Sequence, residues 1–218
     1  MGEAARRKAM GPRSNPNESV DRGPWLHGTN VRFDSWQVPP PLEANDPFNV
    51  PHTAVFLTKH AEFAQDAGSF TCEAMLTPDA RVLVPESDES DMLRRRLQKH
   101  PVGGRCAWLC DEVTWRASWA SGDIMRFAAE ERHALEIVSR MTKLHRQRQP
   151  ELPHDFVSQV VQHNITRGWI EEIVKTARAL GFEAIQGNEI DRHAGAVPIA
   201  RPWLAVCTAT ALTAPVWR

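Results

Sequence analysis

The sequence predicts an α+β fold built on a mostly antiparallel sheet, and three observations support this class. Short apolar and β-branched segments come first, within residues 24–85. Segments with helical spacing of apolar residues fill the middle of the chain, and two more strand-like segments close it. Strands grouped at both ends, rather than alternating with helices, favour α+β over a parallel α/β sheet.

The N-terminal elements follow from alternation between apolar runs and turn residues. "TAVFLT" is β-branched and apolar, which is typical of a buried strand, and Gly68 marks the end of the short helix after it. A long loop rich in Pro, Asn and Asp precedes that strand, and loops of such length are often functional. The predicted order is a strand at 24–29, a loop at 30–52, a strand at 53–58, a helix at 59–68 and two strands within 69–85.

The middle of the chain predicts helices, and its end predicts strands. "TRGWIEEIVKTARALG" has the clearest pattern: Thr166 is expected to cap a helix that Gly181 ends. Residues 101–122 support no clear prediction. The remaining elements are helices at 86–100, 122–149, 154–165 and 166–181, a strand at 182–186, a polar loop at 187–196 and a last strand at 203–209.

Length and composition indicate one domain without a large net charge. The chain has 218 residues, 42% of them hydrophobic, and a formal net charge of −1, so no global charge draws it to nucleic acid or to a membrane. We expect residues 1–20 to form a disordered tail and residues 21–218 to form a single domain. No apolar leader or membrane-length run is present, which predicts a cytoplasmic protein, with a host cell's cytoplasm as one alternative.

Three short motifs together carry the functional prediction. His27-Gly28-Thr29 ends the first strand, "AVFLTKHAEFAQDAG" joins a strand to a helix, and "LGFEAIQGNEID" joins a helix end to a strand and an Asn-Glu pair. In their order and spacing they resemble the motifs of the ADP-ribosyltransferase superfamily. The likeness is greatest to bacterial and phage-associated mono-ADP-ribosyltransferases, which occur as toxins, effectors and domains of phage polyproteins.

The resemblance implies a fold and a reaction. The fold is a split antiparallel β core, here with a large helical insertion at about residues 88–180. The reaction moves ADP-ribose from NAD to a macromolecular acceptor and releases nicotinamide. We expect a protein acceptor rather than a nucleic acid, because the basic clusters at 94–96 and 140–148 resemble solvated helix faces.

The resemblance also implies roles for seven residues. Glu189 is the candidate catalytic carboxylate, because an oxocarbenium-like ribose needs a nearby negative charge. It is preferred over Asp191 because the Asn-Glu pair follows the strand at the family's spacing. His27 would bind the adenosine ribose, and Phe56 would stack on nicotinamide. The backbone of Gly28 would meet the carboxamide, where a side chain would obstruct the ligand. The remaining residues expected to bind NAD are Thr29, Thr58 and Asn188.

Some features depart from the family pattern and keep alternatives open. The chain has no tyrosine, so Phe56 stands where many relatives place one, and Arg201-Pro202-Trp203 contributes no acid to the last strand. A catalytically inactive binding module and an NAD glycohydrolase therefore remain alternatives. Individually, His27 can be a structural histidine and Thr58 a helix cap. The cysteines form no metal-ligand pattern, so no metal is predicted.

Overall fold

The computed structural model describes residues 20–41, 52–84, 87–99, 110–125, 132–148, 150–191 and 199–218. Except for Val20, the tail predicted for residues 1–20 lies outside these ranges. Helices and strands occur in the predicted order, so the mixed α+β class is confirmed. They are β1 (Trp25–Thr29), β2 (Val55–Thr58), α2 (Ala61–Asp66), β3 (Phe70–Ala74), β4 (Val82–Leu83), α3 (Asp88–Gln98), α5 (Glu112–Ser121), η2 (Asp123–Met125), α6 (Arg132–Arg148), α7 (His154–Ala179), β5 (Ala184–Asp191), β6 (Ile199–Val206), η3 (Ala209–Ala211) and β7 (Val216–Trp217).

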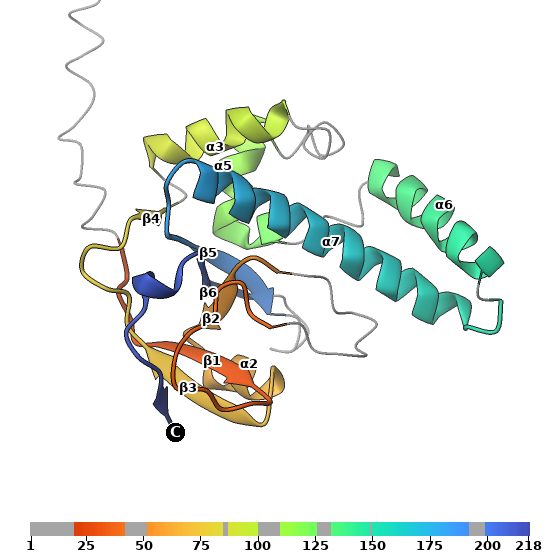
Figure 1. The fold of residues 1–218 in the computed structure, drawn as a ribbon. Coiled ribbons are helices and arrows are strands. Elements are labelled where there is room, and N and C mark those ends of the chain that lie inside the picture. The colour runs from red at the N-terminus through yellow and green to blue at the C-terminus, as the bar shows by residue number, and fades with distance from the viewer. Residues whose placement is uncertain are drawn as a thin grey trace, which may run out of the picture.

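The described strands form one seven-stranded sheet in the order β4-β5-β6-β2-β1-β3-β7 (Figure 1). Every described pairing is antiparallel except that of β4 with β5. The sheet has two parts, because β1 and β2 meet at a single registered pair, Leu26 with Thr58. On either side of this junction the pairing is longer, β2 with β6 and β1 with β3. Because β1 and β2 pair over so short a length, most of each strand is not paired with the other at this junction.

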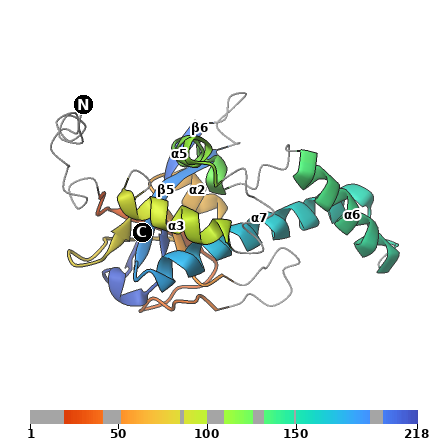
Figure 2. The same ribbon diagram turned by 90° about the horizontal axis from the view of Figure 1, so that it is seen from above.

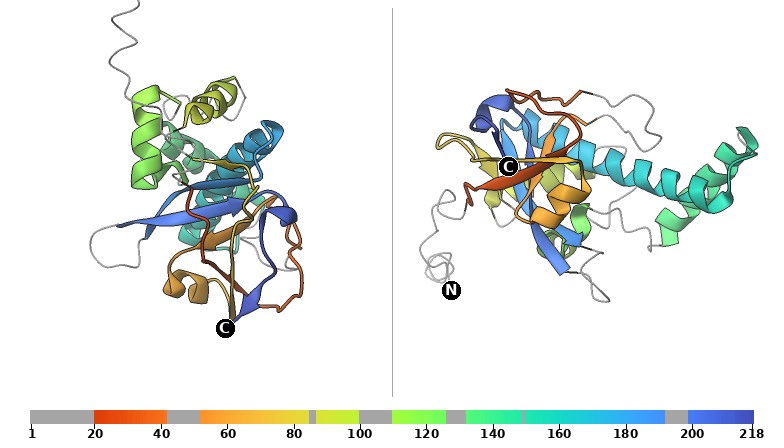
Figure 3. Two further views of the ribbon diagram at one scale, coloured as in Figure 1. Left: turned by 90° about the vertical axis from the view of Figure 1, so that its left-hand side faces the viewer. Right: turned by 90° about the horizontal axis from the view of Figure 1, so that it is seen from below.

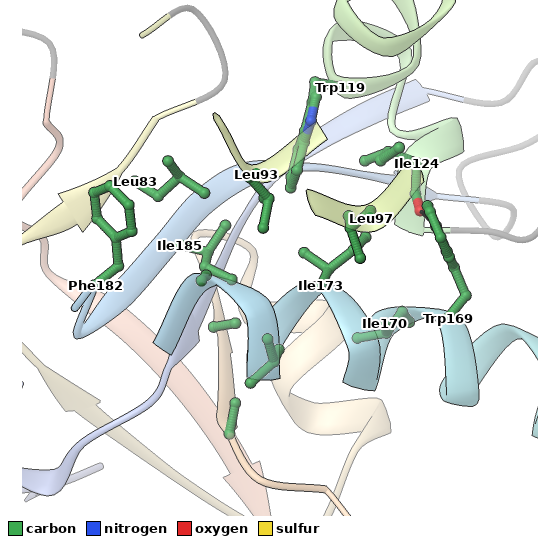
Figure 4. Close-up of a cluster of buried hydrophobic side chains, with 14 of the residues drawn as sticks. Leu83, Leu93, Leu97, Trp119, Ile124, Trp169, Ile170, Ile173, Phe182 and Ile185 are labelled. Atoms are coloured by element: carbon green, nitrogen blue, oxygen red, sulfur yellow. Dashed lines mark hydrogen bonds between the residues drawn. The ribbon is translucent and has the colours of Figure 1, made fainter. Parts of the chain in front are cut away.

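Helices cover the two parts of the sheet on different sides. α3, α5 and α7 lie over the β4-β5-β6-β2 part, whereas α2 packs on β1 and appears in front when the molecule is seen from below (Figure 3). The core around α7 contains four buried tryptophans, and one of them, Trp169 of α7, donates a 2.9 Å hydrogen bond to the carbonyl oxygen of Ile124 (Figure 4). Burial of such large rings fixes where α7 lies on the sheet.

One continuous helix, α7, replaces the two helices predicted at 154–165 and 166–181. Thr166 lies inside α7 and is no cap, so that prediction is wrong. Gly168 does not end the helix either, because the buried side chains of Trp169, Ile170 and Ile173 hold the following turns on the sheet. Tertiary packing thus outweighs the cost of about 1 kcal/mol that glycine brings to a helix interior.

β5 is longer than predicted. The polar loop expected from residue 187 is wrong for residues 187–191, which belong to β5 and pair with β6 through Asp191↔Ile199. Residues 192–196 of that prediction lie outside the described ranges. The polar residues stay in the strand because β6 satisfies their backbone groups along the whole length of β5. Glu189 consequently occupies a strand position, with its place set by the sheet register.

α5 forms in the region for which the sequence supported no prediction. Asp111 caps it by accepting hydrogen bonds from the backbone N–H groups of Val113 and Thr114, both at 3.1 Å. Gly122, with φ +84°, ends it in the left-handed conformation. Two rings, Trp115 and Trp119, bury its inner side. Local capping and a buried aromatic face together explain the helix.

α6 and the N-terminal half of α7 form a hairpin that projects beyond the sheet (Figures 1 and 2). A separate small cluster holds the hairpin together, with Val138 on one helix and Val157 and Val161 on the other. The described helices include none that is long and apolar enough to cross a membrane. α7 therefore has two differently packed halves, one in the main core and one in the hairpin.

Candidate functional site

A cavity of about 690 Å³ opens where the two parts of the sheet meet, beneath α7. Strands β1, β2, β5 and β6 form one wall, α2 closes one end and α7 forms the opposite wall. Five residues predicted for the site line this cavity, although they are up to 162 positions apart in the chain (189 − 27): His27, Gly28, Phe56, Thr58 and Glu189. The fold thus brings together side chains from three motifs that the sequence analysis singled out.

Glu189 projects from β5 on the face of the sheet that α7 covers. It is registered opposite Arg201 of β6, so two opposite charges are cross-strand neighbours in the cavity wall. The end of α5 packs on its backbone: a Cβ on Gly122 would lie 2.8 Å from the carbonyl carbon of Glu189. Both the ladder and α5 therefore fix the backbone from which this carboxylate extends.

His27 spans the junction between the sheet halves. Its Nδ1 lies 2.9 Å from the carbonyl oxygen of Phe56, and since a carbonyl only accepts, Nδ1 carries the hydrogen and donates it. Burial lowers the pKa of His27, so the ring is neutral at pH 7 and its Nε2 keeps a lone pair. Trp36 and Phe33 flank the ring, with Trp36 at 5.5 Å between centroids. This arrangement presents one hydrogen-bond acceptor in a fixed orientation.

Phe56 is the aromatic centre of the site. Buried Trp203 supports its ring with the centroids 5.4 Å apart and the planes at 30°. His52 meets the ring edge-on at 5.1 Å, and the guanidinium carbon of Arg167 lies 5.6 Å from the ring centroid. An aromatic ring with such neighbours can bind a planar or cationic group through its face.

Gly28 lines the cavity, but the structure gives another reason for its missing side chain. A Cβ at this position would lie 1.6 Å from the carbonyl oxygen of Ala64 in α2. The close approach is therefore to the backbone of α2, and the expectation that glycine was needed to admit a ligand is not required. The sequence indicated a close contact correctly and could not say with what.

Thr58, Thr29 and Asn188 have local partners. Thr58 lines the cavity, and its hydroxyl accepts a 3.2 Å hydrogen bond from the backbone N–H of His60, just before α2. Thr29 lies outside the lining and bonds to the backbone of Val31. Asn188 also lies outside the lining; its amide donates to the carbonyl oxygens of Trp119 and Ala120, both at 3.3 Å. Asn188 thus ties β5 to the end of α5.

The wall formed by α7 was not predicted from the sequence. It presents a polar stripe whose members recur at helical spacing: Gln159, Gln162, His163, Thr166 and Arg167. Arg167 is half-buried, and its Nε donates to Nε2 of His163 at 3.4 Å. Burial lowers the pKa of Arg167, and the charge of Glu189 acts in the opposite direction. The signal available was this polar stripe beside the apolar face of the same helix.

His52, outside α7, also lines the cavity and was not predicted from the sequence. Burial, with the charges of Arg167 and His163 as further causes, lowers the pKa of His52 from 6.5 to about 4. Its ring is therefore neutral at pH 7. The adjacent Thr53 donates its backbone N–H to Oε2 of buried Glu171 at 3.0 Å, which anchors this segment to α7.

The described cysteines lie outside the lining of this cavity. Cys72, Cys110 and Cys207 are buried free thiols, and burial raises the pKa of each to about 11, 11 and 12 respectively. Within the described ranges, no group of three or more His, Cys, Asp or Glu side chains could hold a metal ion. The side chain of Asp191, the alternative acid, lies outside the described part of the structure.

Comparison of the chain with models of protein families, with curated proteins and with solved structures found no match. The functional argument therefore rests on the cavity and its residues.

Proposed function

We propose that this protein is a mono-ADP-ribosyltransferase that transfers ADP-ribose from NAD to a macromolecular acceptor. The observation that carries the proposal is the presence of His27, Phe56 and Glu189 in one cavity. These three residues belong to separate sequence motifs and lie on three different strands, β1, β2 and β5. The volume, about 690 Å³, lies within the range of about 300–1,000 Å³ typical of small-molecule and cofactor sites.

In this proposal each side chain has a distinct task. Phe56 stacks on the nicotinamide ring, and neutral His27 accepts a hydrogen bond from the adenosine ribose through Nε2. Glu189 binds a hydroxyl of the other ribose and stabilises the positive charge that develops on it. The held geometry of these groups lowers the entropic part of the barrier. A mostly antiparallel sheet whose two parts meet at this cavity supports the proposal.

The proposed transfer needs only NAD and the acceptor as reactants. The bond between the ribose C1′ and the nicotinamide nitrogen breaks, and its electron pair leaves with nicotinamide, which becomes neutral. A lone pair of the acceptor forms the new bond to C1′, and the acceptor's proton passes to solvent. Glu189 acts by charge and hydrogen bonding throughout. We propose a protein acceptor, in keeping with the overall formal charge of −1.

Labelled NAD, incubated with the purified protein and a cell extract, tests the proposal. We expect label on a macromolecule and release of nicotinamide, both lost in Glu189→Ala and in His27→Ala. Removal of the label by protease, but not by nuclease, would identify a protein acceptor. Nicotinamide release without a labelled macromolecule would instead indicate an NAD glycohydrolase.

A binding module without catalysis is the second candidate, and one observation favours it. Arg167 already interacts with both the Phe56 ring and the charge of Glu189, two groups that the reaction needs. A module of this kind would raise its melting temperature in the presence of NAD without releasing nicotinamide. Thermal shift and nicotinamide release, measured on one sample, distinguish the two functions.

A further inference from the structure

Arg167 engages the groups expected to bind the reactive end of NAD. Its guanidinium carbon lies 5.6 Å from the centroid of Phe56, within the range of a cation–π interaction. The negative charge of Glu189 acts on the same guanidinium. All three residues line the one cavity. A planar cation therefore already lies on the aromatic ring and within the field of the carboxylate.

The nicotinamide ring of NAD has the same physical character as this guanidinium. It is flat, carries one positive charge and would stack on Phe56 beside Glu189. Two planar cations cannot share one ring face, because they would overlap and repel each other. The other neighbours of Phe56 cannot make room as readily. Trp203 is buried in the core, and His52 meets the ring edge-on.

Packing of α7 fixes the backbone of Arg167, whereas its long side chain can rotate. Trp169, two residues further on, is fully buried and donates a hydrogen bond to the carbonyl oxygen of Ile124. Ile170 packs in the same core. A movement of α7 would break these contacts. Rotation about the side-chain bonds of Arg167 would instead break its hydrogen bond to His163, its contact with Phe56 and its charge interaction with Glu189, and would leave the core intact. Any displacement of the guanidinium is therefore a side-chain movement.

We propose that Arg167 is an internal occupant of the nicotinamide subsite, with its guanidinium lying on Phe56 in place of the ligand's cationic ring until the ligand displaces it. This inference rests on the proposed function for its ligand. An internal competitor raises the apparent Kd by the inverse of the fraction of time for which the site is free. It also selects for charge, since only a cationic ring restores the interactions with Phe56 and Glu189 that Arg167 gives up. Arg167 is thus a specificity-determining residue of this cavity.

Calorimetry with a simple pyridinium cation tests the inference. The probes are 1-methylnicotinamide, which is planar and cationic, and nicotinamide, its neutral counterpart, each titrated into the full-length chain. We expect Arg167→Met to bind 1-methylnicotinamide about tenfold more tightly than the unmodified protein, with a smaller gain for nicotinamide. Arg178→Met, which removes an exposed arginine near the end of the same helix, should leave both affinities unchanged.

Equal or weaker binding of 1-methylnicotinamide by Arg167→Met overturns the inference, as does binding by neither protein. A second measurement does not depend on that variant folding. In the unmodified protein, the NMR signal of the Arg167 Nε–H group should shift when 1-methylnicotinamide is added, as its contact with the ring is lost. An Nε–H signal that stays in place at saturating ligand also overturns the inference.

Nicotinamide release from NAD, measured in parallel, separates this inference from the proposed function. Tighter cation binding by Arg167→Met without any release from NAD upholds the internal occupant and rejects the transferase. Release by the unmodified protein without tighter binding by the variant does the reverse.

Discussion

The two walls of the cavity are built in different ways. On the sheet wall, Phe56 and Glu189 leave strands whose register is set by a continuous ladder, and His27 is fixed by a 2.9 Å hydrogen bond. On the α7 wall, Arg167 reaches in from a helix that is held by apolar contacts of neighbouring residues. Short, tied side chains suit chemistry that needs fixed geometry. Long side chains on a helix suit adjustment, so the proposed catalysis would belong to the sheet wall and the proposed selectivity to the α7 wall.

The two halves of α7 extend this contrast. Its C-terminal half lies in the main core with Trp169, Ile173 and Val174, whereas Val157 and Val161 of the other half pack on α6 in a small cluster. Arg167 lies close to the boundary between them. Regions with few buried apolar contacts open more readily than a central core. The helix wall is therefore rigid at one end and less firmly held at the other.

The largest effect is expected from the sheet-wall carboxylate. Glu189→Gln keeps the size of the side chain and removes its charge, so nicotinamide release from NAD should fall about 100- to 1,000-fold. The melting temperature should fall moderately, because the backbone ladder between β5 and β6 stays intact while Arg167 and Arg201 lose a neighbouring negative charge. Initial rates by chromatography of released nicotinamide provide the measurement. Glu62→Gln, an exposed acid of α2, is the matched control, and a loss below tenfold in Glu189→Gln would contradict the assignment.

Gly28→Ala tests whether the missing side chain at position 28 makes room for the backbone of α2 or for a ligand. We expect a loss of about 1–3 kcal/mol in the free energy of unfolding, because the new Cβ meets the backbone oxygen of Ala64. Gly168→Ala is the control: its Cβ would contact nothing within 4 Å, so the helix should gain about 0.5–1 kcal/mol. Urea titration followed by tryptophan fluorescence measures both. Unchanged stability with lost NAD binding in Gly28→Ala would show that the ligand, and not α2, requires the glycine.

His27 allows its two ring nitrogens to be tested apart. His27→Phe leaves the carbonyl of Phe56 without its donor and should cost about 1–2 kcal/mol of stability. His27→Asn keeps an N–H near the position of Nδ1, so it should lose less. Both variants remove the acceptor Nε2 and should weaken NAD binding about tenfold. Tight NAD binding by His27→Asn would show that the histidine is structural.

The smallest effect concerns His52, which stands on the helix side of Phe56. Its pKa is about 4 in the folded protein against 6.5 ordinarily, so the unfolded chain takes up a proton first as the pH falls. The stabilising contribution is complete above pH 6.5 and is lost between about pH 6.5 and 4. Melting temperatures from pH 7.5 to 4.5 should fall less steeply in His52→Gln than in the unmodified protein. Identical slopes would assign the acid sensitivity to other groups.

Local pattern was sufficient for much of the fold. The strands β1, β2 and β3 and the helices α2 and α3 lie within their predicted ranges, because apolar alternation, caps and turn residues are local signals. The same approach failed at Thr166, where a good capping residue lies inside a helix, and at Gly187, where a polar run continues a strand. In both places a partner distant in sequence decides the conformation.

The sequence by itself determined which residues could do chemistry: a histidine after the first strand, an aromatic ring on the second and a glutamate near the end. Only the tertiary structure decided that these residues share a cavity, that Gly28 faces α2, and that Arg167 lies over Phe56. The reason is physical. Residue type and short spacing report on local backbone preference, whereas a cavity is made by contacts between segments far apart in the chain, whose register and packing no local pattern encodes.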